Sequence, residues 1–192
     1  MNFKDININE AAFIHPSSII YGKVRLGKGS SIWPNVVIRA EMHEVEIGSH
    51  TNIQDFSMIH VGAATGTYIG NYCSVTHHCT IHGCTIEDNC LIGINSTIMD
   101  GAVVGKNSIV AGGSFIKEGM IVPENSIVMG VPAMVKKIKN NFISNRFNAF
   151  MYETNGIAYS KGDFRLWARE DYQKIAKAKM EEIKNEFNKR YE

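Results

Sequence analysis

The twelve residues from Cys73 to Cys84, CSVTHHCTIHGC, contain three histidines and three cysteines. Imidazole and thiolate groups are the usual ligands of zinc in proteins. The four cysteines of the chain form no CxxC pair, although such pairs are typical of zinc-thiolate sites. The histidines are therefore the better candidates for metal ligands, and the elements that position them decide whether they can meet.

The main regularity of the sequence is an aliphatic residue at every sixth position. The longest unbroken run is Ile86, Ile92, Ile98, Val104, Val110, Ile116, Val122 and Val128, and shorter runs are Leu26, Ile32, Ile38, then Ile47, Ile53, Ile59, then Ile69, Val75, Ile81. A helix repeats its apolar residues every 3.6 positions and a strand every second one, so a step of six fits neither. It predicts short strands joined by tight corners, as in a parallel β-helix with triangular coils of about eighteen residues.

The cysteines follow the same repeat. Each of Cys73, Cys79, Cys84 and Cys90 precedes one of these aliphatic residues by two positions, where small residues recur. A buried, reduced cysteine packs as a small hydrophobic side chain. We therefore expect four free thiols inside the β-helix rather than disulfides or metal ligands. Reduced cysteines are the usual state in the cytoplasm.

The repeat is interrupted at three places, and the histidines cluster near two of them. The interrupted steps are nine residues from Ile38 to Ile47, ten from Ile59 to Ile69 and five from Ile81 to Ile86. His60 and His82 each follow an inward isoleucine directly, so both side chains should point outward. His77 lies two positions after Val75, nearer a corner of the coil.

Three neutral imidazoles with an open fourth position are the ligand set of catalytic zinc sites. Because the three histidines have different phases in the repeat, one chain would not bring them together, and a neighbouring subunit would have to donate one. Solvated histidines on a solenoid surface are the alternative. Spacing alone leaves both interpretations open.

Composition narrows the class of protein. The chain has 192 residues, 44% of them hydrophobic, and a formal charge of +1 from 20 basic and 19 acidic residues. This balance disfavours nucleic-acid binding. No stretch of about 18 apolar residues indicates a membrane span, and the charged N-terminal residues Lys4, Asp5 and Glu10 do not resemble a signal peptide. We expect a cytoplasmic protein.

Several longer segments identify a family. Residues 10 to 138, including SIWPNVVIRAE, IGSHTNIQDFSMIHV, VTHHCTIHGCTIEDNCLIGINSTIMDGAVVGKNSIVAGG and IVPENSIVMGVPAMVKKI, resemble the gamma-class carbonic anhydrases and their relatives. The resemblance implies a left-handed parallel β-helix that forms homotrimers. It also implies metal ligands at His60, His77 and His82, with His60 and His82 of one subunit meeting His77 of the next.

The resemblance assigns roles to further residues. Gln54 matches a glutamine that hydrogen-bonds the metal-bound water or bicarbonate, and Asn52 matches an asparagine that lines the CO2 pocket. Arg39, Glu41 and Asp55 match residues of the subunit interface, where Arg39 pairs with an acid of the neighbouring subunit. That acid is usually aspartate in the family, whereas this chain has Glu41. As plain polar residues of β-helix corners, Asn52 and Asp55 would need no such role.

The implied activity is the reversible hydration of CO2 to bicarbonate by metal-bound hydroxide. The metal would be zinc, although three imidazoles also accept iron or cobalt. The founding type of the family carries an acidic proton-shuttle loop, and RAEMHEVEIG is too short to contain it. His43, Glu44 and His78 are the candidate replacements. Two alternatives are an acyltransferase that uses acyl-coenzyme A and a catalytically silent metal-binding trimeric scaffold.

The repeat ends after Pro132, which divides the chain into a β-helix domain at residues 1–135 and a helical segment at residues 136–192. Residues 135–159 and 163–192 are expected to be helical, with Asp163 as an N-cap. The second helix shows one apolar stripe, at Ala176, Met180, Ile183 and Phe187, which predicts packing along the β-helix. The aromatic segment 140–161 would either form the core of this layer or overhang a neighbour's metal site.

Overall fold

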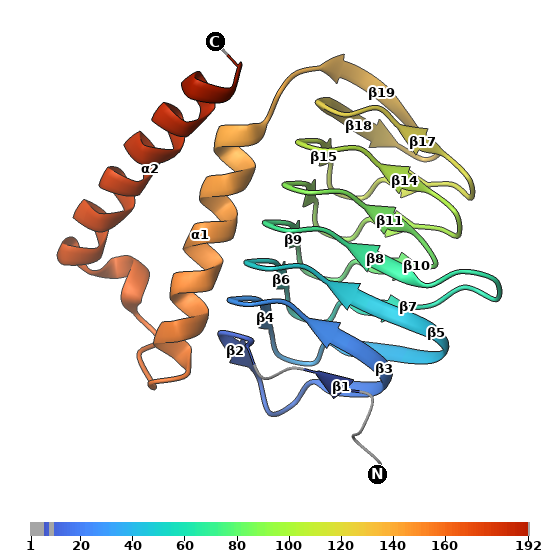
Figure 1. Ribbon diagram of the computed structural model, residues 1–192, viewed down its shortest axis with the longest axis horizontal. Coiled ribbons are helices and arrows are strands. Elements are labelled where there is room, and N and C mark those ends of the chain that lie inside the picture. Colours follow the sequence, from blue (N-terminus) through green and yellow to red (C-terminus); the bar gives the residue numbers. More distant parts are fainter. Residues whose placement is uncertain (1–5, 8–9, 192) are drawn as a thin grey trace.

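A computed structural model describes residues 6–7 and 10–191, so Lys4 and Asp5 lie outside the described residues. The chain forms a parallel β-solenoid of stacked triangular coils, flanked by two helices (Figure 1). The fold class predicted from the six-residue repeat is confirmed. Among the described residues, no helix combines the length and apolar character that crossing a membrane requires.

Three faces build the solenoid. Face A contains β7 (Met58–His60), β10 (Thr80–His82), β13 (Thr97–Ile98) and β16 (Phe115–Ile116). Face B contains β8 (Thr67–Ile69), β11 (Thr85–Ile86), β14 (Val103–Val104) and β17 (Ile121–Val122). The long strands β3 (Ile19–Leu26) and β5 (Val37–Ile47) continue from face A to face B, and β1 (Ile6–Asn7) pairs with β3.

Face C is the surface that the helices cover. It contains β2 (Phe13–Ile14), β4 (Ser31–Ile32), β6 (Asn52–Ile53), β9 (Ser74–Val75), β12 (Leu91–Ile92), β15 (Ile109–Val110), β18 (Ser126–Gly130) and β19 (Ala133–Ile138). Its strands pair in parallel except for β18 and β19, which pair antiparallel. Residues 135–138, expected to be helical, are therefore the end of a strand.

The aliphatic repeat forms the core. Ile38, Ile59, Ile81, Ile98 and Ile116 are register partners in successive coils of face A, and all are fully buried. All four cysteines are free and buried in the same interior, as predicted. Stacked aliphatic side chains exclude water from the interior while the backbone hydrogen bonds run from coil to coil.

The columns of corners between the faces use the left-handed backbone conformation. Between faces A and B the positive-φ residues are glycines, Gly83, Gly101 and Gly119. Between faces C and A they are Asn35, Phe56, His78, Asn95 and Gly113, and between faces B and C they are Gly29, His50, Tyr72, Asn89, Asn107 and Asn125. Glycine and asparagine adopt this conformation most readily. The histidines and aromatic residues in these columns are exceptions, and they stack on one another: His50 on Tyr72, and Phe56 on His78.

The C-terminal helices form a separate layer. Helix α1 (Phe142–Tyr159) contacts β2, β4, β6 and β9 of face C, and α2 (Glu170–Tyr191) packs mainly on α1 after the short helix η2 (Leu166–Ala168) (Figure 1). The predicted stripe faces inward, with Ala176 and Ile183 buried, but α2 packs mainly against α1 and not along the β-helix as expected. Asp163 is not the N-cap of α2. It accepts a hydrogen bond from the Arg165 backbone and pairs with Arg169 instead.

Candidate functional site

His60 and His82 meet on the outer surface of face A. They are register partners at the ends of β7 and β10, and His60 Nδ1 lies 3.1 Å from His82 Nε2. The repeat positions them in this way because the isoleucine before each one points into the core, which turns the histidine outward. The outward orientation predicted for these two residues is confirmed.

Each of these histidines uses its other ring nitrogen on a carboxylate. His82 Nδ1 contacts Asp100 Oδ1, and His60 Nε2 lies 3.1 Å from Glu41 Oε2. If each neutral ring donates its single proton to its carboxylate, the two remaining lone pairs face each other at 3.1 Å. Such an arrangement is stable only with a proton or a cation between the rings.

The donor set fits a metal ion. Two imidazole nitrogens on one tetrahedral zinc, at about 2.0–2.1 Å each, lie roughly 3.3–3.4 Å apart. The distance between His60 Nδ1 and His82 Nε2 is close to this value. Carboxylates that hold the second nitrogen of a ligating histidine are the usual outer partners of such ions.

His77 does not join this pair within one chain. It lies on the corner between faces C and A, and its Nδ1 is 3.0 Å from Asp55 Oδ2, one coil earlier. Among residues 6–7 and 10–191, no group of three histidine, cysteine or acidic side chains is arranged to hold a metal. His77 nevertheless shares the pattern of the other two, because a carboxylate again fixes one ring nitrogen and leaves the other one available.

Asn52 and Gln54 flank the inward Ile53 on face C and are almost fully buried. Asn52 Nδ2 donates to Ser74 Oγ at 2.9 Å, and Gln54 Nε2 donates to Asn52 Oδ1 at 2.9 Å. Gln54 Oε1 is buried and has no donor among the described residues. A buried acceptor without a partner destabilises the folded protein, so this oxygen is available to a ligand that can donate a hydrogen bond.

Arg39 and Glu41 contact each other within one chain on β5. Partial burial acts to raise the pKa of the Glu41 carboxyl, but hydrogen bonds from its own backbone and His60, together with the Arg39 charge, hold that pKa below its usual value. Glu41 is thus an ionised partner of both Arg39 and His60.

The candidate proton shuttles occupy different surroundings. His78 is exposed beside His77 and stacks on Phe56, with ring centroids 4.9 Å apart. His43 Nε2 lies 3.3 Å from the Ala63 carbonyl. Glu44 is engaged by Lys23 and Tyr68, and hydrogen bonds from these two side chains hold the pKa of Glu44 below its usual value.

Two residues near the site were missed by the sequence analysis. Asp100, which holds His82, follows it by 18 residues and therefore lies in the same column one coil later. That spacing was a usable signal. Tyr152 of α1 lies near Asp55, and burial followed by the Asp55 charge raises the pKa of Tyr152 to about 12. No spacing within the repeat predicts a contact made by a separate helix.

Comparison with known proteins gives consistent matches. The family model described as bacterial transferase hexapeptide (six repeats) matches residues 5–40 and 83–118. Gamma carbonic anhydrase 2 of Arabidopsis thaliana mitochondria is 40% identical over 100 residues, which cover 49% of this chain and 36% of that protein. A probable carbonic anhydrase of Methanocaldococcus jannaschii is 43% identical over 91 residues, covering 47% of this chain and 57% of that protein.

A solved structure matches over a greater length. A hexapeptide transferase family protein from Anaplasma phagocytophilum is 33% identical and superposes with a TM-score of 0.71, covering 82% of this chain and 91% of that one. The matched part of this chain spans only 36% and 57% of the lengths of the two curated relatives. The repeat, the fold and these matches agree: the chain belongs to the gamma carbonic anhydrase-like family of hexapeptide-repeat proteins.

Proposed function

We propose that this protein is a metal-dependent, gamma carbonic anhydrase-like enzyme that hydrates CO2 reversibly to bicarbonate. The observation that carries the proposal is shared by His60, His77 and His82: each has one ring nitrogen at a carboxylate, from Glu41, Asp55 and Asp100 respectively. Carboxylates orient metal-binding histidines in this way and raise their basicity. Solvated surface histidines would need no such partners.

The site would lie between subunits of a homotrimer. His60 and His82 of one subunit would hold the ion on face A, and His77 would be contributed from the corner of the next subunit. Zinc is the proposed metal, with iron or cobalt as substitutes. Such an ion lowers the pKa of bound water to about 7 and makes hydroxide available at neutral pH. A cytoplasmic location is also proposed, in keeping with four free cysteines.

The polar residues of face C would orient the reactants. Gln54 Oε1 would accept a hydrogen bond from the attacking water, because this oxygen has no donor among the described residues. Asn52 fixes Gln54 by accepting from its Nε2. An amide does not titrate, so this orientation would persist across the working pH range.

CO2 hydration releases a proton that must leave the site. Among His43, Glu44 and His78, the surroundings favour His78 because it is exposed and adjacent in sequence to His77. Imidazole titrates in the physiological range and suits this task. Glu44 suits it less well, because Lys23 and Tyr68 already use its carboxylate.

Acyl transfer is the second candidate function. It is favoured by the similarity to a hexapeptide transferase family protein and by the matching family model. An acyltransferase on this scaffold would need one histidine as a general base and no metal. It would leave two of the three carboxylate-bound histidines without a role. The third possibility is a metal-binding scaffold without catalytic activity, which would agree with the absence of the acidic loop. It predicts that the protein binds metal but does not turn over CO2.

Stopped-flow CO2 hydration on zinc-loaded and cobalt-loaded protein tests the proposal. Wild type should exceed the uncatalysed rate, and His77→Ala should lose this activity. His15→Ala, which removes a histidine that contacts Ser17 outside the site, should match wild type. Tight metal binding with no hydration in wild type would instead support the scaffold, and metal-independent turnover of acetyl-coenzyme A would support acyl transfer.

A further inference from the structure

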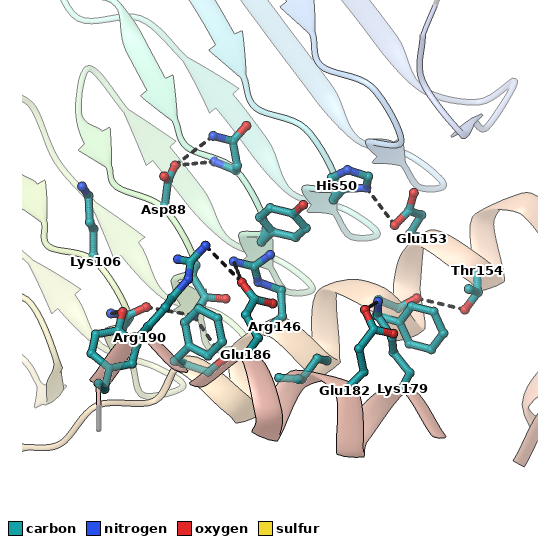
Figure 2. Close-up of a pocket in the computed structure, with 18 of the residues that line it drawn as sticks. His50, Asp88, Lys106, Arg146, Glu153, Thr154, Lys179, Glu182, Glu186 and Arg190 are labelled. Atoms are coloured by element: carbon teal, nitrogen blue, oxygen red, sulfur yellow. Dashed lines mark hydrogen bonds and ion pairs between the residues drawn. The ribbon is translucent and has the colours of Figure 1, made fainter. Parts of the chain in front are cut away.

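A cavity of about 820 Å³ lies between the helices and the corner column that joins faces B and C (Figure 2). Its solenoid wall includes Tyr72 and Asn89, and α1 contributes Phe142 and Arg146. Helix α2 closes the outer side with residues that include Glu186. A volume of this size accommodates a small organic molecule.

Arg146 is the unusual group in this cavity. Its side chain is only 14% exposed, and its guanidinium carbon lies 3.5 Å from the centre of the Tyr72 ring. Among the described residues it donates no hydrogen bond, and its buried Nε has no partner. The Glu186 carboxylate approaches only to 3.8 Å, beyond hydrogen-bond distance. A buried guanidinium whose N–H donors are free destabilises the folded protein unless an acceptor binds it.

The acidic residues around the cavity already have hydrogen-bond or ion-pair partners. Figure 2 shows that Glu186 pairs with Arg190, and their atoms lie 3.1 Å apart. The other pairs are Glu182 with Lys179 at 2.7 Å, Glu153 with His50 at 2.8 Å, and Asp88 with the Asn71 backbone at 2.8 Å. Among the described residues, Arg146 and Lys106 are the basic groups of this lining that no carboxylate reaches within hydrogen-bond distance, and Arg146 is the more deeply placed between the helices and the solenoid.

Two further features of the solenoid wall indicate a binding surface. Tyr72 adopts φ of 57°, a conformation that a bulky side chain rarely takes and that asparagine occupies in the next coils. The strained tyrosine presents its ring to Arg146. Asn89, only 2% exposed, leaves its Oδ1 without a donor. Backbone strain and unpaired buried atoms are characteristic of ligand sites.

We propose that this cavity binds a small organic carboxylate with an apolar body. The edge of the Arg146 guanidinium would take the carboxylate through two parallel hydrogen bonds, for which its planar geometry is suited. The rings of Tyr72, Phe142 and Phe150 would contact the apolar part. A phosphate dianion fits less well because Glu182 and Glu186 border the same space.

This site is distinct from the proposed metal centre. The cavity opens at the corner between faces B and C, whereas His77 lies at the corner between faces C and A and His60 and His82 lie on face A. A ligand here would touch α1, α2 and the solenoid together. It would therefore fix α2, whose described contacts are mainly with α1 and η2.

Isothermal titration calorimetry with 4-phenylbutyrate tests the proposal on the full chain. The titrations are repeated with 4-phenylbutan-1-ol and 4-phenylbutylamine, which keep the apolar body and change the charge. Protein treated with a chelator is used so that a carboxylate cannot bind at a metal. The variants are Arg146→Met, Arg146→Lys and Arg169→Met, the last removing an exposed arginine paired with Asp163 and Asp171.

We expect 4-phenylbutyrate to bind at least about tenfold more tightly than the alcohol or the amine, since a charge-assisted pair would be lost with either. Arg146→Met should lose this preference, Arg146→Lys should retain part of it, and Arg169→Met should behave as wild type. Tyr72→Asn, which relieves the strained backbone, should keep the fold and also weaken binding. Thermal melting checks that each variant is folded.

The proposal is wrong if wild type shows no saturable binding of 4-phenylbutyrate at millimolar concentration. It is equally wrong if the amine binds as tightly as the carboxylate, or if folded Arg146→Met and folded Tyr72→Asn both bind like wild type. None of these results depends on metal or on CO2 hydration, so they leave the proposed function untouched.

Discussion

His60 and His82 face each other across adjacent coils, with Nδ1 of the first 3.1 Å from Nε2 of the second, although 22 residues separate them. The ten-residue step after Ile59 adds four residues to this coil. The insertion is absorbed between β7 and β8 at residues 61–66, so the column of inward isoleucines stays in register. The outer histidines consequently stay aligned, and their pairing is a property of the coil rather than of the loop.

Asp100 should matter for metal affinity even though it would not touch the ion. Its carboxylate holds His82 Nδ1, and removing its charge weakens the basicity and orientation of the ring. Asp100→Asn is expected to weaken zinc binding about 10–100-fold, measured by competition with a chelator. Asp171→Asn, an exposed aspartate on α2, serves as the control and should leave affinity unchanged. Equal affinity in both variants would contradict the role of Asp100.

The stability of the solenoid should depend on the inward column. Ile92→Ala removes a fully buried side chain and is expected to cost about 2–5 kcal/mol in the free energy of unfolding. Ile94→Ala, two positions later and 55% exposed, should change it by less than about 0.5 kcal/mol. Denaturant unfolding measures both. Similar losses of unfolding free energy for Ile92→Ala and Ile94→Ala would contradict the prediction that burial decides the cost.

The left-handed corners should discriminate between side chains. Asn95 is exposed and has φ of 60°. Asn95→Ala is expected to destabilise the fold by about 1 kcal/mol, because alanine adopts this conformation less readily than asparagine. Asn95→Gly should cost less than Asn95→Ala, since glycine has no Cβ. Asn188→Ala on α2 is the control for loss of an asparagine side chain. The prediction is refuted if the Asn95→Ala protein is more stable than the Asn95→Gly protein.

The buried thiols should make the protein sensitive to alkaline pH. Burial raises the pKa of Cys84 from 9.0 to about 12. Above pH 9 the unfolded chain releases this proton and the folded chain keeps it, so the stabilising contribution is complete below pH 9 and declines as pH rises toward 12. Unfolding free energies measured between pH 8 and 10.5 should fall, and less steeply in Cys84→Ala.

The same burial predicts chemical inertness. Iodoacetamide modifies the thiolate form of cysteine, which the folded chain does not expose. Native protein at pH 8 should therefore show no labelling of the four cysteines by mass spectrometry, whereas unfolded protein should be labelled at all four. Rapid labelling of native Cys73, Cys79, Cys84 or Cys90 would contradict their placement in the core.

The repeat predicted the inward column and the outward histidines because a period of six fixes which residues face the core. Asp100 was missed, although its 18-residue distance from His82 follows the same period, because it is not itself a metal-binding histidine. Residues 135–138 of strand β19 were expected to be helical because this charged segment lacks the repeat. Its antiparallel pairing with β18 is a tertiary effect, as is the approach of Tyr152 to Asp55.

The central claim is that His77 of one subunit completes a site with His60 and His82 of another. Complementation tests it most directly: His77→Ala and His82→Ala proteins are unfolded, mixed in equal amounts, refolded with zinc and assayed for CO2 hydration by stopped flow. Each variant alone should be inactive, and the mixture should recover about one quarter of wild-type activity, the share of interfaces that combine two intact halves. An inactive mixture beside an active wild type, or a His77→Ala protein as active as wild type, would contradict the shared site.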